Sequence, residues 1–425
     1  MDNENTNWLH DLFIKEAKAA KDYHNNGGGG VEYDGAIDIV DDGGEASAYL
    51  QEKIIDVTAN GTVEVTPDEG HALSKVTANV DVVSAEEWIN DGNTHIWISL
   101  PEGRISPILG FGVYGTVSVD WGDGTIPDVL TGTGATTLQY TPTHDYASAG
   151  DYVITLTVDG EMGFCASGLL LHPSKNSNSY VYKSAIQKVE CGNAVRIIND
   201  KAFDSCYNLT SINIPEGVTS LGNYAFQNCY SLASINIPDS VTRMGVSVFT
   251  NCYSLASVNA QGGLTSIGNS AFQRCYSLAT VNMQEGVTSL GNNMFDSCYN
   301  LTNIVIPEGV TSLGNNVFMD CKSLTSINIP NGVASIGTNA FANCYSLVSI
   351  NIPDSVTSIG NTAFYMCYGL AKIRFEGAIP PSVGGSSAFT YLPTDCIISI
   401  PVGSLEAYTT ATNYPSASTY TYVEE

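Results

Sequence analysis

Hydrophobic and polar positions repeat with a period of 23 residues through the second half of the chain. Apolar residues recur at fixed distances after a phenylalanine, as in AFQNCYSLASINIPDSVTRMG from Ala225. The phenylalanines that mark the period are Phe203, Phe226, Phe249, Phe272, Phe295, Phe318, Phe341 and Phe364. A unit of this length cannot bury its apolar face alone, so the pattern predicts a solenoid of stacked copies.

Each copy contains one short strand with alternating sides. In the first copy, Leu209, Ile212 and Ile214 have the L-x-x-L-x-L spacing of a leucine-rich repeat, and Ser211 and Asn213 should point outward. The string AFxxCxxLxxIxIPxxVTxIG resembles the BspA-type leucine-rich repeat of bacterial surface proteins. The resemblance predicts eight rungs over residues 193–376, within a repeat region at 169–376.

The period breaks near the C-terminus. Phe389 follows Phe364 by 25 residues, and Pro380, Pro381, Gly384 and Gly385 interrupt the pattern. A solenoid needs its exposed end covered, so we expect residues 377–425 to form a C-terminal cap.

Residues 47–92 alternate apolar and polar positions with a period of two, around a turn signal at Asn60-Gly61. This pattern predicts a small β-module. Its phrase TANGTVEVTPDEG followed by LSKVTANV resembles a short element of phage structural proteins, which implies a virion protein.

Residues 93–168 contain VSVDWGDGT from Val117 and HDYASAGDYVITLTV from His144. Alternating strands separated by Asp-Gly and Ala-Gly turns predict an Ig-like β-sandwich. The two strings resemble the polycystic-kidney-disease (PKD) domain, although the aromatic residue that this family has between Trp121 and Gly122 is missing. Such domains usually serve as spacers or adhesion modules.

The N-terminal segment, residues 1–46, combines a short helical pattern with a Gly-rich and acidic linker. The apolar stripe has no core of its own, so we expect it to dock on a virion structural protein, with a frayed tail as the alternative. The candidate docking residues are Trp8, Leu9, Leu12 and Phe13. The expected fold class is therefore mainly β and multidomain: a short helix, a small β-module, a PKD-like sandwich and a capped solenoid.

The charge is negative and unevenly distributed. The net charge is -27, and residues 1–100 carry 20 acidic against 5 basic side chains, whereas residues 201–300 carry 5 against 3. A polyanionic surface repels phosphate backbones and anionic lipids, which argues against nucleic-acid binding and membrane insertion. The first residues also lack the pattern of a signal peptide.

Eight of the 11 cysteines occupy one repeat position, three residues after each phenylalanine. Stacked strands would bring neighbouring thiols close enough to bridge, but cysteine is also an ordinary small buried residue. We expect a reduced, buried column, made of Cys206, Cys229, Cys252, Cys275, Cys298, Cys321, Cys344 and Cys367.

No catalytic or cofactor motif is present, and the repeats hold few titratable groups, so we expect neither an enzyme nor a cofactor. Asp120, Asp123 and Asp128 are potential calcium ligands, but Asp-Gly turns explain these residues without a metal.

Two outward columns are candidates for receptor binding. Tyrosine supplies rigid amphipathic contact area, and asparagine supplies amides to a sugar or peptide; both columns can equally stack along the solenoid and only stabilise it. The candidates are Tyr207, Tyr230, Tyr253, Tyr276, Tyr299, Tyr345 and Tyr368, and Asn213, Asn236, Asn259, Asn282, Asn328 and Asn351. Lys322 interrupts the first column, and Val305 and Arg374 interrupt the second.

These features together suggest a non-enzymatic adhesion protein. We expect a phage fibre or receptor-binding protein on the virion surface, which binds a host-surface protein or glycan through its repeats. A homo-oligomer such as a trimer is a candidate assembly. A BspA-like adhesin on a bacterial cell surface and the accessory binding part of a carbohydrate-active system are the alternatives.

Overall fold

The computed structural model describes residues 91–102, 106–135, 142–164, 184–260, 263–283 and 285–425, with five short strands outside these ranges. The chain forms two compact units, Met1–Ile89 and Asn90–Glu425. The predicted N-terminal helix and its docking residues lie outside the described residues, as does Cys165.

The first unit contains two antiparallel strand pairs. β1 (Ile37–Ile39) pairs with β4 (Val76–Ala78), and β2 (Asp56–Val57) pairs with β3 (Val63–Glu64). Because β2 and β3 are antiparallel, the chain reverses between them, in agreement with the turn signal at Asn60-Gly61.

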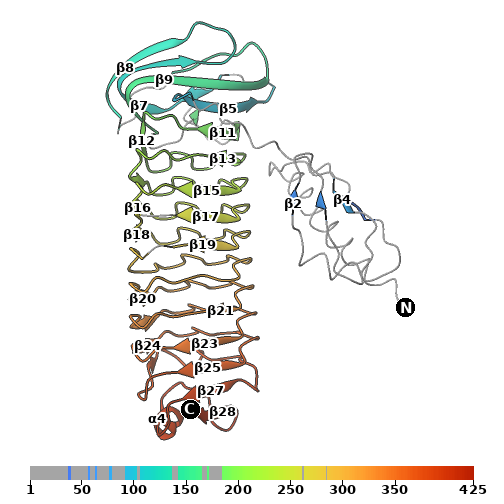
Figure 1. Cartoon of the computed structure of the whole chain (residues 1–425), viewed down its shortest axis with the longest axis vertical. Helices are drawn as coiled ribbons and strands as arrows, with labels where there is room; N and C mark the ends of the chain where they lie inside the picture. Colours follow the sequence, from blue (N-terminus) through green and yellow to red (C-terminus); the bar gives the residue numbers. More distant parts are fainter. Residues whose placement is uncertain are drawn as a thin grey trace. The chain divides into compact units, whose positions relative to one another are not determined.

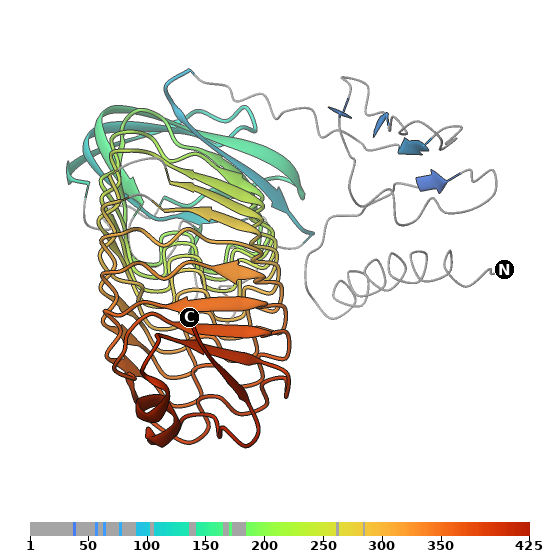
Figure 2. The same cartoon turned by 60° about the horizontal axis from the view of Figure 1, so that its bottom comes forward.

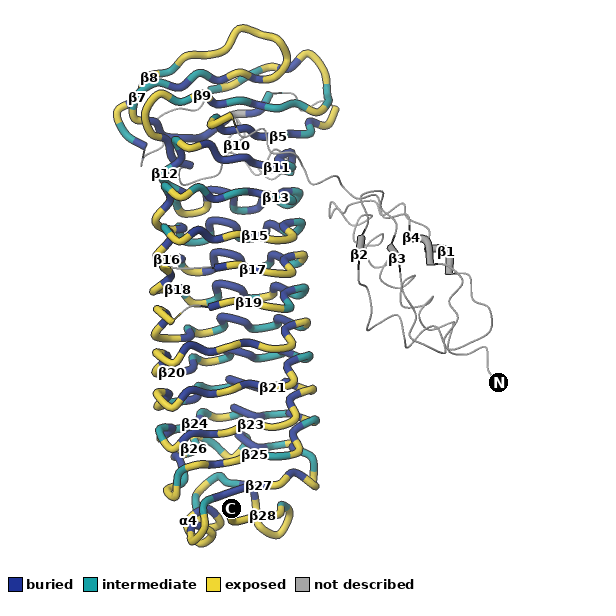
Figure 3. The backbone as a smooth tube through the Cα atoms, viewed as in Figure 1, coloured by how far each residue is buried: buried dark blue, intermediate teal, exposed yellow. Residues whose placement is uncertain are grey.

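The second unit is a stack of rungs with an antiparallel sheet at its N-terminal end (Figure 1). Each rung has three sides: a first sheet face, a second sheet face, and a turn side that carries the repeated phenylalanine (Figure 2). Buried and exposed residues alternate along strands such as Ser234–Ile237 and Ser349–Ile352, so the core runs through the middle of the stack (Figure 3).

On the first face most strands pair in parallel with the rung before or after them. These strands are β11 (Ile186–Glu190), β13 (Ser211–Ile212), β15 (Ser234–Ile237), β17 (Ser257–Ala260), β19 (Thr280–Asn282), β21 (Ser326–Ile327), β23 (Ser349–Ile352), β25 (Lys372–Phe375), β27 (Ile397–Ile400) and β28 (Thr421–Glu424).

On the second face most strands span two residues, directly before the glycine of their rung. They are β12 (Val195–Ile198), β14 (Ser220–Leu221), β16 (Arg243–Met244), β18 (Ser266–Ile267), β20 (Ser312–Leu313), β22 (Ser335–Ile336), β24 (Ser358–Ile359) and β26 (Ser382–Val383).

On the turn side, the repeated phenylalanines form one buried stack. Neighbouring rings from Phe203 to Phe389 lie 5.2 to 5.7 Å apart between centroids and are nearly parallel. Phe389 continues the stack despite its irregular spacing in the sequence. Every copy therefore supports its neighbours through the same contact, as expected for a solenoid.

All ten described cysteines, including the eight of the predicted column, are buried and unbridged. From Cys229 to Cys367, each thiol donates to the carbonyl oxygen of the phenylalanine in the preceding rung, with Sγ to O distances of 3.1 to 3.2 Å. Burial raises the pKa of these thiols well above their usual range, which keeps the donating proton in place. The prediction of a reduced core column is confirmed for these residues.

The N-terminal sheet consists of β5 (Thr94–Leu100), β7 (Phe111–Asp120), β8 (Asp128–Gly134) and β9 (Gly150–Phe164), in the antiparallel order β8-β7-β9-β5. A separate pair joins β6 (Ile108–Leu109) to β10 (Leu170–Leu171). We call residues 91–171 the N-terminal module.

The sequence predicts an Ig-like sandwich over residues 93–168, and in the structure the N-terminal sheet of this region continues into the repeats. β5 pairs antiparallel with β11 on the first face, and β9 pairs in parallel with β12 on the second. Phe164, at the end of β9, contacts the ring of Phe203 at 5.0 Å. The module therefore covers the edges and the apolar end that the first rung would otherwise expose.

Two facing glycines allow the long strands of the module to bend. Gly115 and Gly160 are paired across β7 and β9, with φ angles of 109° and 127°. A Cβ atom on Gly115 would lie 2.0 Å from the carbonyl oxygen of Asp159. Only glycine fits this close backbone approach.

At the other end, β27 and β28 extend the first face beyond the last complete rung, and α4 (Leu405–Thr410) follows β27. Tyr408 is buried against Phe375, and its hydroxyl donates to the carbonyl oxygen of Gly377. These residues occupy the C-terminal end of the core.

Candidate binding surface

The predicted tyrosine column is a stack of rings along one edge of the solenoid. Rings from Tyr207 to Tyr299 lie 4.7 to 4.8 Å apart between centroids. The ammonium group of Lys322 lies 4.2 Å from the centre of the Tyr299 ring and ends this run. Tyr345 and Tyr368 form a second, shorter stack at 5.5 Å. The tyrosine rings therefore stack from rung to rung, as the structural interpretation of the column predicted.

The stacking decides which parts of the tyrosines remain accessible. The five rings of the first run are half-buried, because each face covers its neighbour. Burial and the neighbouring hydroxyls of Tyr253 and Tyr299 raise the pKa of Tyr276. Tyr345 and Tyr368 are 38% and 53% exposed. Within the first run, which we call the tyrosine ladder, stacking therefore covers the ring faces and leaves the rings partly exposed.

The predicted asparagine column lies on the outward side of the first face. Asn213 is bonded to both backbone groups of Cys191, and the amide of Asn259 donates to Asn236 at 3.0 Å. Asn282, Asn328 and Asn351 are exposed, and no such side-chain bond joins them to a neighbouring rung within the described ranges. Only part of the column forms the expected amide ladder.

A second set of asparagines, which sequence reasoning missed, does connect the rungs. The side-chain oxygens of Asn223, Asn269 and Asn292 each accept a hydrogen bond from a backbone N–H of the next rung, at 2.8 to 2.9 Å. These residues directly follow the glycine of each repeat, and their recurrence every 23 residues was visible in the sequence. Their role is structural, because the amides are used inside the stack.

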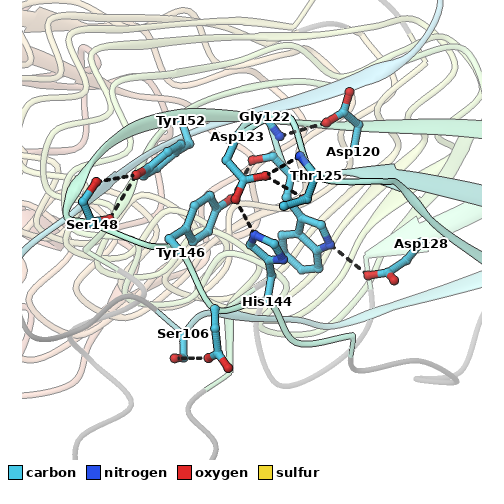
Figure 4. A network of polar contacts seen from close by, with 12 residues as sticks. Ser106, Asp120, Gly122, Asp123, Thr125, Asp128, His144, Tyr146, Ser148 and Tyr152 are labelled. Carbon is cyan, nitrogen blue, oxygen red and sulfur yellow. Dashed lines mark hydrogen bonds and ion pairs between the residues drawn. The ribbon is translucent and has the colours of Figure 1, made fainter.

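The aspartates considered for calcium stabilise a turn in the N-terminal module (Figure 4). Asp123 accepts hydrogen bonds from Thr125, and its carboxylate lies 2.7 Å from Nε2 of His144. The hydrogen bond from the Thr125 hydroxyl, followed by the contact with His144, lowers the pKa of Asp123 to about 2. Asp120 accepts from the backbone of Gly122, and Asp128 accepts from the indole of Trp121. All three carboxylates therefore have partners within the turn.

Aromatic rings complete this network. The His144 ring stacks on Trp121 at 5.0 Å, and the Tyr146 hydroxyl donates to the carbonyl oxygen of Trp121 at 2.8 Å. In the part of the chain that the structure describes, no group of three or more His, Cys, Asp or Glu residues is placed to hold a metal ion. The described helices include none that is long and apolar enough to cross a membrane.

The first face is interrupted at residues 303–306. This segment belongs to neither the sheet that ends at β19 nor the sheet that begins at β21. Shallow depressions of about 330 and 300 Å³ lie on its two sides. The hydrophobic pattern does not reveal the interruption, because Ile304 and Ile306 keep the buried positions of the repeat.

The 23-residue repeats match a known family. A model described as a BspA type leucine-rich repeat region, with 6 copies, matches residues 175–302 and 288–404, together more than half of the chain. The chain belongs to the BspA-type leucine-rich repeat family. No curated protein sequence matches it.

Solved structures of other leucine-rich repeat proteins are similar in part. A leucine-rich repeat protein of T. pallidum is 29% identical over 43% of this chain and 83% of its own, with a TM-score of 0.38. A leucine-rich cell surface protein of Faecalibacterium prausnitzii is 27% identical over 52% and 67%, with a TM-score of 0.36. The pneumococcal vaccine antigen PcpA is 16% identical over 71% and 95%, with a TM-score of 0.32.

Proposed function

We propose that this protein is a non-enzymatic adhesion protein that recognises a host-surface protein or glycan through its repeats. The observation that carries the proposal is the tyrosine ladder, in which stacking fixes five rings in one line before any partner binds. Rings that are already ordered lose little entropy on binding, and tyrosine is enriched at binding hot spots.

Family membership supports the same function. BspA-type repeat proteins are typically surface proteins with a binding role, and the match indicates no catalytic family. The exposed asparagine column lies on the first face, six residues after the tyrosines of the same rung, and adds neutral hydrogen-bonding groups.

In this proposal the protein lies on the surface of a phage virion, and its N-terminal segment docks on a virion structural protein. The support is the resemblance of residues 47–92 to an element of phage structural proteins. The alternative, a bacterial cell surface, draws its support from the family. Immunogold labelling of purified phage particles and of intact cells from the same source distinguishes the two, because only one preparation should carry the label.

Replacing Tyr253, Tyr276 and Tyr299 together with Ser tests the role of the ladder. We expect cell binding to weaken by more than about 1 kcal/mol for each hot-spot residue. The matched control replaces Thr242, Thr265 and Thr288, in neighbouring rungs on the second face, with Ser. Circular dichroism checks that both variants are folded, and unchanged binding of a folded tyrosine variant would contradict the proposed surface.

A further inference from the structure

Segment 303–306 lacks the hydrogen bonds that join the other rungs. Along the start of the first face, the N–H of Ala256 donates to Ala233, that of Ala279 to Ala256, and that of Thr325 to Thr302. The equivalent bond from Thr302 to Ala279 is absent among the described residues. Strand pairing is also missing between β13 and β15, but there the Ala233 N–H still reaches the carbonyl oxygen of Thr210.

The second face is interrupted at the same junction. The N–H of Gly268 donates to Met244 and that of Gly314 to Leu290, but no bond from Gly291 to Ile267 is present in the described part. On the turn side the junction is intact, since the Phe272 N–H donates to Met294 at 3.0 Å. The two sheet faces are therefore open at a point where the core remains closed.

The sequence also departs from the repeat here. Gln261 and Gln284 stand where other rungs have proline, and Val305 stands where they have asparagine. Val305 is 70% exposed, and Ile304 beside it is buried. The departure thus changes the surface of the repeat and leaves its core positions apolar.

The two depressions beside this segment are lined by polar side chains together with apolar ones. They contain the side-chain amides of four asparagines and the hydroxyls of three Ser or Thr residues, with Val305 as the exposed apolar group and Glu308 as the charged group. The polar residues are Asn259, Asn282, Asn303, Asn328, Ser257, Thr280 and Ser326. Amides and hydroxyls both donate and accept hydrogen bonds, as do unpaired backbone groups.

We infer that residues 303–305 and the two depressions form a binding site for a neutral glycan, an inference that rests on the proposed adhesive function. Sugar hydroxyls match groups that donate and accept at the same place, and the apolar face of a sugar ring can pack on Val305. No Lys or Arg lines either depression to attract a sialylated or sulfated chain.

A peptide strand fits this place less well. Strand addition needs a continuous open sheet edge, with backbone groups free over several residues. Here the interruption spans one short segment, and the Thr325 N–H still donates to Thr302 at 3.2 Å beside it. Two depressions on either side of a three-residue segment instead suit adjacent sugar units.

The test begins with the full chain on an array of immobilised neutral, sialylated and sulfated glycans. We expect binding to neutral glycans. Affinities for the strongest neutral glycan are then measured for Asn282→Ala and Asn303→Ala, which should each bind at least five-fold more weakly. Thr242→Ala and Thr265→Ala, at exposed positions of the second face, are the controls and should stay within two-fold of the unchanged protein.

Each other outcome overturns the inference in a distinct way. Equal losses in Asn236→Ala and Asn351→Ala would spread binding along the whole asparagine column. Absence of neutral-glycan binding, or binding of peptides that depends on Asn303, would exclude a glycan site; if the protein still binds cells, the proposed adhesive function stands. If the full chain binds no cells, the proposed function fails as well.

Discussion

The turn side and the first sheet face of the same repeats differ in continuity. On the turn side, the stacked phenylalanines run through every rung, and the cysteine thiols bond from rung to rung between Cys229 and Cys367. On the first face, strand pairing stops at β19 and resumes only at β21. The comparison indicates that the buried side holds the solenoid together, which leaves the exposed face free to depart from the repeat.

The largest expected effect is alkaline unfolding, because it acts on the whole buried column. Burial raises the pKa of nine cysteines above 9.0, so an unfolded chain would release their protons first. Their contribution is complete below pH 9 and is lost as pH rises towards the folded pKa values. Each thiol that ionises only in the unfolded chain lowers the free energy of unfolding by up to about 1.4 kcal/mol per pH unit above its unfolded pKa.

Chemical denaturation at several pH values, with reductant present, measures this effect. Thiol labelling of the native protein should be slow and should begin at Cys396, where burial raises the pKa only to about 11. A free energy of unfolding that stays constant from pH 8 to 10.5 would argue against a buried, protonated column.

Replacing Phe295 with Ala should cost about 3 to 5 kcal/mol, because it leaves a cavity in the stack. Phe295 lies beside the open junction, so the loss should also uncouple the rungs before it from those after it. Phe226→Ala, in a region with paired strands on its second face, is the matched control. Hydrogen exchange should show that Phe295→Ala lowers amide protection over more residues than Phe226→Ala does. Identical patterns of protection for the two variants would contradict the claim that the sheet faces are open at this junction.

A smaller effect is expected from a comparison within one rung. Tyr276→Ser removes stacking on both neighbouring rings and should cost about 1 to 3 kcal/mol, since each aromatic pair contributes about 0.5 to 1.5 kcal/mol. Asn282→Ala, on the first face, should change stability by less than about 0.5 kcal/mol. Thermal unfolding of both variants measures the two losses of stability. A larger loss for Asn282→Ala than for Tyr276→Ser would indicate that the first face, rather than the tyrosine side, stabilises the rung.

The smallest effect on stability is expected at Val305. Val305→Asn restores the common residue on an exposed site and should alter stability by less than about 0.5 kcal/mol. Because the missing bonds are backbone bonds, it should not rejoin the strands. Recovery of strong amide protection at residue 305 in this variant would show that the side chain causes the interruption.

The repeats were predictable from the sequence because every buried position recurs. The alternation of Ile235 and Ile237 with exposed neighbours sets the strand, and the 23-residue return of Phe and Cys sets the stack. The pairing of β5 with β11 was not predictable, because it joins residues about 90 positions apart without any periodic signal.

The candidate site was only partly predictable. The sequence pattern shows the tyrosine and asparagine columns. It does not show which part of each tyrosine ring is covered by stacking. The interruption at 303–306 leaves the hydrophobic pattern unchanged, and a sequence pattern reports side chains rather than backbone pairing. A sign of segment 303–306 in the sequence is Val305, which stands at a position of the asparagine column.

Residue-resolved hydrogen exchange of the free protein tests the contrast between the two sides most directly. The amides of Phe295 and Cys298 donate to Val317 and to Phe295, so they should be strongly protected. The amides of Ile304 and Val305 lack strand partners and should exchange far faster, while those of Ile350 and Asn351 in the paired β23 should be slow. Equal protection at residues 304 and 350 would contradict an open first face.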